Sequence, residues 1–212
     1  MKSQRLISSG IILTVLAAGA ALAAPKPMSP SGTAATQVQG KWSNPDDPEK
    51  RTYEGGKWIE IVYSRPILRG RTEIFGKGAD YGKVVNGGAP VWRAGANQTT
   101  KLKTDADLIM GGKKIPAGDY DIFVDLKESG WTLILSTQPT MDHYDDKEKT
   151  KIWGAYGYDP KYDVVRVPMK MITPEYSIDQ FTITFVDMTE QGGKLAMAWG
   201  KTAALVPFTV AK

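Results

Sequence analysis

Hydrophobic and polar positions alternate with a period of two along much of the chain after residue 57. The clearest example is 119–126, where one face carries Tyr120, Ile122, Val124 and Leu126, and the other carries Asp119, Asp121 and Asp125 with Phe123. Such alternation is typical of a strand that buries one face and exposes the other. No apolar stripe with a period of 3.6 residues is long enough for a substantial helix in this region. The pattern therefore predicts an all-β fold.

Turn residues divide this pattern into short strands. Gly111-Gly112 between two apolar runs predicts a tight hairpin, because glycine accepts the positive φ values of primed turns. The expected fold is an antiparallel β-sandwich, jelly-roll-like or Ig-like, with about nine or ten strands. The predicted strands are 58–64, 108–110, 113–115, 119–126, 131–136, 152–158, 164–169, 181–186, 195–199 and 204–210.

The first 57 residues differ from the rest in composition. Lys2 and Arg5 precede an apolar run that ends in Ala21-Leu22-Ala23, which predicts a signal peptide over residues 1–23 and a periplasmic or secreted protein. A membrane anchor is the alternative, but glycines and alanines make this run a poor span, so no membrane span is expected after processing. Residues 24–57 are rich in Pro, Gly and polar residues and predict a flexible leader, with the β-sandwich domain at 58–212.

Composition narrows the range of partners. The 212 residues are 42% hydrophobic, which suits one domain with a real core, and the absence of cysteine excludes disulfides and thiol chemistry. The formal charge of +4 includes Lys2 and Arg5 and falls to about +2 without them, too little to indicate a nucleic-acid partner. A small molecule, a glycan or an envelope protein remains as the expected partner.

The residues around Trp92-Arg93-Ala94-Gly95-Ala96-Asn97 carry the most distinctive polar chemistry. Guanidinium forks and an amide suit a carboxylate, a phosphate or sugar hydroxyls. The same residue types also pack their stems and bond loop carbonyls, so a structural role stays open. Two tyrosines on one side of the predicted strand 152–158 suit either a sugar platform or the core. The candidate ligand-binding residues are Tyr63, Arg65, Arg71, Arg93, Asn97, Tyr156 and Tyr158.

Other chemistry has weaker support. The acidic row Asp119, Asp121 and Asp125 would suit calcium or glycoside chemistry, but a solvated strand face explains it equally. His143 is the only histidine and stands in a charged segment that suggests a solvated loop. We therefore predict no metal and no cofactor, and we assign no catalytic residues.

A series of short motifs runs through the chain from residue 63 to residue 167. The motifs are Tyr63-Ser64-Arg65-Pro66, Gly70-Arg71, Phe75-Gly76, Tyr81-Gly82-Lys83-Val84, Trp92-Arg93-Ala94-Gly95-Ala96-Asn97, Pro116-Ala117-Gly118-Asp119-Tyr120, Trp131-Thr132-Leu133-Ile134-Leu135, Trp153-Gly154 and Asp163-Val164-Val165-Arg166-Val167. In this order they resemble a family of exported bacterial proteins catalogued as a domain of unknown function (DUF2911). The resemblance implies a periplasmic or secreted β-rich domain and carries no assigned activity. In one departure from the family pattern, Val85–Pro90 separate the Tyr81 motif from Trp92-Arg93.

Three functions stay open on the sequence. The first is a non-enzymatic periplasmic or secreted β-sandwich that binds a small molecule, a glycan or an envelope partner. The second is a carbohydrate-active hydrolase or isomerase that uses Arg and carboxylate side chains. The third is a structural module in envelope assembly.

Overall fold

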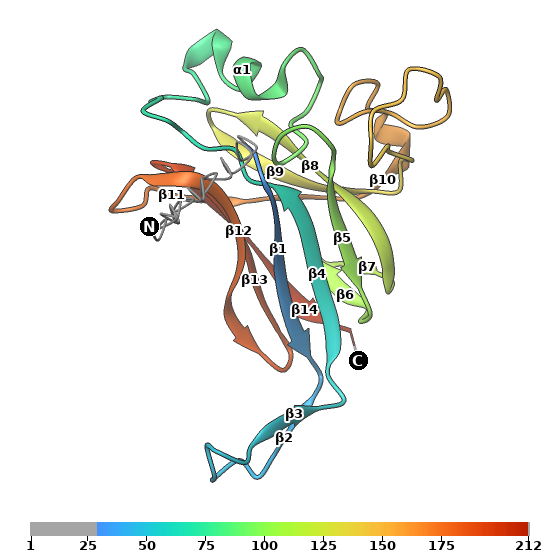
Figure 1. The fold of residues 1–212 in the computed structure, drawn as a ribbon, viewed down its shortest axis with the longest axis vertical. Helices are drawn as coiled ribbons and strands as arrows, with labels where there is room; N and C mark the ends of the chain where they lie inside the picture. The colour runs from blue at the N-terminus through green and yellow to red at the C-terminus, as the bar shows by residue number, and fades with distance from the viewer. Residues whose placement is uncertain (1–28, 212) are drawn as a thin grey trace, which may run out of the picture.

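The computed structural model describes residues 29–211, which form two packed antiparallel sheets and a small separate hairpin (Figure 1). The signal peptide predicted for residues 1–23 lies outside the described residues. Sheet 1 has the order β1-β4-β5-β8-β9-β10, and sheet 2 has the order β12-β13-β14-β6-β7 with β11 also paired to β14. The all-β sandwich prediction is confirmed, with 14 strands where about nine or ten were expected. The strands that were not predicted are Ser31–Val38, Thr100–Thr104 and the three-residue strands Lys41–Ser43, Thr52–Glu54 and Lys170–Ile172.

The bounds of the elements are as follows. Sheet 1 contains β1 (Ser31–Val38), β4 (Lys57–Ser64), β5 (Thr100–Thr104), β8 (Gly118–Lys127), β9 (Gly130–Ser136) and β10 (Asp163–Pro168). Sheet 2 contains β6 (Leu108–Met110), β7 (Lys113–Ile115), β11 (Lys170–Ile172), β12 (Ile178–Thr189), β13 (Gly192–Gly200) and β14 (Thr202–Val210). The hairpin is β2 (Lys41–Ser43) with β3 (Thr52–Glu54), and the helices are the 3-10 turns Gly78–Asp80 and Pro160–Tyr162 and the one-turn α1 (Lys83–Asn86).

The main core lies between the two sheets, as the alternation in β8 predicts. Tyr120, Ile122, Val124 and Leu126 all belong to it, and strands of sheet 2 supply Phe181, Met197 and Val206 from the other side. Phe123, on the opposite face of β8, belongs to a second, smaller cluster on the outside of sheet 1. Loops cover that cluster with Ala89, Val91 and Ala155, and these loops lie at the top of Figure 1.

The leader predicted for residues 24–57 is wrong for its described part. Strand β1 pairs with β4 in unbroken register from Ser31↔Ser64 to Val38↔Lys57, and Ala34 and Val38 are buried in the core. The segment is polar and rich in small residues, so its strand character comes from pairing with a distant partner that local composition does not reveal. The β2–β3 hairpin then projects from the body (Figure 1).

The strand predicted at 152–158 is also wrong, because these residues form turns. Gly154 and Gly157 adopt φ values of 59° and 85°, which bend the chain out of an extended course. Ile152 and Tyr158 of this segment pack from a loop onto the outside of sheet 1, with Ala155 fully buried there.

Candidate functional site

The seven predicted ligand-binding residues do not form one cluster. Arg71, Arg93 and Asn97 line one cavity of about 360 Å³, and Tyr156 lies beside Arg93. Tyr63, Arg65 and Tyr158 do not line it. We call this cavity, lined by Arg71, Arg93, Asn97, Trp92 and Trp199 together with Ser29, Pro66, Val84, Val85, Gly95 and Ala96, the arginine cavity.

A loop closed at its base positions Arg93. Trp92 continues the ladder of β8 by exchanging two backbone hydrogen bonds with Val124, at 2.9 and 2.8 Å. The Trp92 indole N–H donates to the Gly95 carbonyl at 3.0 Å, and the Thr100 hydroxyl donates to the Ala94 carbonyl at 2.7 Å. The loop is therefore held by buried hydrogen bonds, with the wholly buried Trp92 as its anchor.

Arg93 is half-buried and has only part of its donor capacity in use. Its Nη1 donates to the Asn97 carbonyl at 2.9 Å, and its guanidinium carbon lies 5.2 Å from the centre of the Tyr156 ring. Tyr156 is itself tied to Gly87, whose carbonyl accepts its hydroxyl at 3.0 Å. Gly154 makes room, since a Cβ there would lie 2.5 Å from Arg93 Nη1. The side chain is thus held in place while N–H groups remain available.

Arg71 approaches the same cavity from the loop after β4. Its Nε donates to the Leu68 carbonyl at 3.0 Å and its Nη2 to the Ile67 carbonyl at 2.7 Å. Its guanidinium carbon lies 5.7 Å from the centre of the Trp199 ring. Two arginines, each resting on an aromatic ring, therefore line one cavity.

The arginine cavity itself is lined without a carboxylate among the described residues, although Arg71 also lines a neighbouring cavity that contains Glu73 and Glu128. The described lining of the arginine cavity contains no Asp or Glu, and no ion pair among residues 29–211 involves Arg71 or Arg93. Such a site has a positive potential that favours an anion.

The other predicted residues serve the scaffold. Tyr63 is buried, and its hydroxyl donates to the Ile183 carbonyl at 3.2 Å and accepts from the Ile183 N–H at 3.0 Å, which links the two sheets. The Arg65 stem packs against Gly32, where a Cβ would lie 2.2 Å from Arg65 Cδ. Arg65 Nε is buried without a hydrogen-bond partner.

Tyr158 belongs to a closed polar network on the outside of sheet 1. Its hydroxyl donates to Asp163 at 2.6 Å and accepts from Arg166 at 2.9 Å, and Arg166 also pairs with Asp125 at 2.8 Å. Burial, followed by the hydrogen bond to Asp163, raises the pKa of the Tyr158 hydroxyl. Its ring packs 5.1 Å from that of Phe123, so this tyrosine stabilises the outer cluster.

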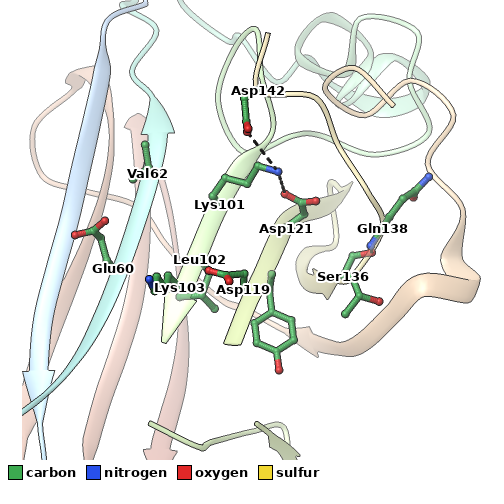
Figure 2. A pocket seen from close by; sticks show the side chains of 12 residues that line it. Glu60, Val62, Lys101, Leu102, Lys103, Asp119, Asp121, Ser136, Gln138 and Asp142 are labelled. Atoms are coloured by element: carbon green, nitrogen blue, oxygen red, sulfur yellow. Dashed lines mark hydrogen bonds and ion pairs between the residues drawn. The ribbon is translucent and has the colours of Figure 1, made fainter. Parts of the chain in front are cut away.

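A second polar site lies on the outer face of sheet 1 (Figure 2). Lys101 Nζ forms an ion pair with Asp121, 2.8 Å from its Oδ1, and lies 3.8 Å from Oδ1 of Asp142. The Thr140 hydroxyl donates to the other Asp121 oxygen at 2.9 Å and also accepts from Lys101. Lys101 is not among the candidate residues predicted from the sequence, although the spacing Lys101-x-Lys103 places two cations on one strand face.

Asp121 is only 5% exposed, and burial raises the pKa of its carboxyl above the ordinary value, against the opposing effects of Lys101 and Thr140. Because the folded state then holds this proton more tightly than the unfolded chain, Asp121 should lower stability progressively as the pH rises from about 3.9 through the raised pKa. We expect the free energy of unfolding of Asp121→Asn, measured relative to that of the parent, to increase between about pH 3 and pH 7, because only the parent loses this stability. Urea titrations across this range measure it, and the opposite trend would show that Lys101 outweighs burial.

Two further properties bear on function. Residues 29–211 contain no helix with the length and apolar character that crossing a bilayer requires. Within the same residues, no group of three or more His, Asp or Glu side chains is placed to hold a metal ion. His143 lies exposed in the loop after β9.

Comparison with known proteins gives one match. The model of a family described as "Protein of unknown function (DUF2911)" matches residues 45–208. No curated protein and no solved structure matches the chain.

Proposed function

The chain belongs to the DUF2911 family, whose description assigns no activity, and from the geometry of the arginine cavity we propose that it binds a small anionic ligand there. The observation that carries the proposal is that Arg71 and Arg93 line one cavity without any carboxylate in its described lining. Neither arginine has an ion-pair partner within 4.0 Å among residues 29–211, so an anion in the cavity would gain attraction from both. Proteins retain such arrangements at binding sites at some cost in stability.

The remaining donors define the ligand chemistry. Arg71 uses Nε and Nη2 on backbone carbonyls, and Arg93 uses Nη1, so each guanidinium keeps donors free of hydrogen bonds to residues 29–211. Guanidinium forks bind carboxylate and phosphate oxygens with charge-assisted hydrogen bonds. A volume of about 360 Å³ is at the small end of ligand pockets, which suits a compact carboxylate or phosphate ligand.

The lining supports binding rather than catalysis. The described lining holds no Asp, Glu, His or Lys that would serve as a general acid or base. We therefore favour a non-enzymatic binding protein over a hydrolase or an isomerase. The proposal includes export to the periplasm or beyond, for which the support is the signal-like sequence of residues 1–23.

Calorimetric titration with inorganic phosphate and with citrate, at low salt, tests the proposal. We expect saturable binding of at least one of them by the parent, and a loss of about 10-fold to 100-fold in affinity for Arg71→Ala and for Arg93→Ala, because each removes charge-assisted bonds. Rising salt should weaken binding.

Arg69→Ala is the matched control. It removes the same charge two residues from Arg71, from an exposed side chain that does not line the cavity. Its affinity should stay within about twofold of the parent. The proposal fails if neither anion binds, or if Arg69→Ala weakens binding as much as the two cavity variants do.

A further inference from the structure

The outward positions of three neighbouring strands of sheet 1 form an ordered polar surface, separate from the arginine cavity. The register pairs Glu60 with Lys103 across β4 and β5, and Lys103 with Asp119 across β5 and β8. The next row contains Val62, Lys101 and Asp121. Figure 2 shows these side chains on the floor of one cavity of about 350 Å³, which Gln138 and Asp142 help to line.

Two further cavities lie in the direction of the β2–β3 hairpin, and each shares at least one lining residue with the one before it. Glu60 and Lys103 also line a second cavity of about 390 Å³, together with Trp58, Ala35 and Asp105. Trp58 also lines a third cavity of about 410 Å³, together with Trp42, Tyr53 and Glu190. We call this run of three adjoining cavities, from Asp142 to Trp42, the sheet-1 groove. Outward positions on a strand recur every 6.6 to 6.8 Å, so the stretch from Trp58 to Val62 alone covers about 13 Å, enough for more than one sugar ring.

The aromatic residues of the groove are unusual for their exposure. Trp58 and Trp42 are 49% and 52% exposed, and neither belongs to the hydrophobic core. Trp42 is held by Tyr53 on one side, with ring centres 5.1 Å apart, and by Arg51, whose guanidinium carbon also lies 5.1 Å from the ring. Trp58 stands beside the charged rows, where its flat face is available to stack on a ligand ring.

The groove contains hydrogen-bond donors on cationic side chains and hydrogen-bond acceptors on anionic side chains. Glu60, Lys103 and Asp119 are cross-strand neighbours, yet none takes part in an ion pair within 4.0 Å among residues 29–211. A sugar hydroxyl both donates and accepts, and such a mixed set satisfies both functions.

Charge decides between classes of ligand. Five carboxylates line the first two cavities against two lysines, so the groove repels polyanions such as nucleic acids and acidic polysaccharides. Only Asp121 and Asp142 among these acids lie near Lys101. We propose that the sheet-1 groove binds a neutral oligosaccharide, with Trp58 stacked on one sugar ring and Glu60, Lys103 and Asp119 bonded to hydroxyls.

Tryptophan fluorescence and calorimetric titrations with cellotetraose, maltotetraose and tetra-N-acetylchitotetraose test this proposal on the intact protein. We expect one of these neutral glycans to bind saturably and to change the tryptophan emission, because the exposed Trp58 loses water on stacking. Trp58→Ala should weaken binding about tenfold or more, and Trp58→Phe should restore part of the loss, because a smaller ring still stacks. Glu60→Gln and Lys103→Met should each weaken binding by about threefold to tenfold.

Tyr176→Ala is the matched control, since Tyr176 is 74% exposed and lies outside the groove. Its affinity should equal that of the parent, and urea titrations should show that all variants remain folded. The proposal is overturned if no glycan of the panel binds, if Trp58→Ala binds as tightly as the parent, or if heparin fragments bind in preference to the neutral glycans. Loss of glycan binding in Trp58→Ala with anion binding intact separates this site from the arginine cavity.

Discussion

Replacing Trp92 with alanine is expected to lower the free energy of unfolding by about 4 to 5 kcal/mol, near the upper end of the range for aromatic truncation in a core. The Trp92 side chain is fully buried and contacts aromatic residues from both sheets. Its ring centre lies 5.8 Å from that of Trp131 in sheet 1, and 4.9 Å from that of Phe181 in sheet 2. Truncation would leave a cavity between the sheets and an unsatisfied carbonyl at Gly95.

Urea unfolding followed by far-ultraviolet circular dichroism measures this loss. Trp42→Ala, which truncates the same side chain at an exposed position, should change stability by less than about 1 kcal/mol. Trp92→Phe should recover part of the loss, because a smaller ring fills part of the space. An alanine variant as stable as the parent would contradict the role assigned to Trp92 in joining the sheets.

The second large effect is expected from removal of β1. A chain that begins at Gly40 lacks eight residues that pair with β4, and it exposes the core where Val38 and Ala34 were buried. The lost hydrogen bonds and burial together should cost on the order of 5 kcal/mol or more, which is comparable to the whole stability of a typical domain. The newly exposed edge of β4 should also promote association.

The proper comparison is between a chain that begins at Ser29 and one that begins at Gly40. Urea titration and size-exclusion chromatography of the two should show a much lower transition midpoint, or aggregation, for the shorter one alone. Equal midpoints for both chains would contradict the stabilising role assigned to β1.

The sequence predicts well those elements whose own residues show a regular alternation or a turn motif. β8 alternates so regularly that its inward and outward residues are read directly, and Gly111 and Gly112 supply the positive φ values of the β6–β7 turn. β1 cannot be predicted from its local sequence, because Ser31–Val38 is stabilised by pairing with β4, which follows it in the chain. Aromatic content alone made 152–158 resemble a strand, whereas the conformations of its glycines decide the outcome.

The candidate site was predictable in part for the same reasons. Arg93 and Asn97 are four residues apart and meet through a local loop, so short-range reasoning finds them. Tyr63 occupies an inward position of β4, which directs its side chain into the core. Arg65 directly follows β4 and packs its stem against Gly32, so neither residue lines the cavity. The pairing of Lys101 with Asp121 depends on the register between β5 and β8, which no local pattern specifies.

The position of β14 has a consequence for the order of folding. The last strand of the chain lies inside sheet 2, between β13 and β6, and pairs with β11 as well. Phe208 in β14 pairs with Met110 in β6, so sheet 2 is complete only after β14 pairs with a strand that is synthesised much earlier. Folds dominated by such distant pairings form slowly, on a timescale of milliseconds to seconds. A growing chain therefore cannot complete sheet 2 until β14 has been synthesised, and the unpaired strands of this sheet stay exposed to proteases until then.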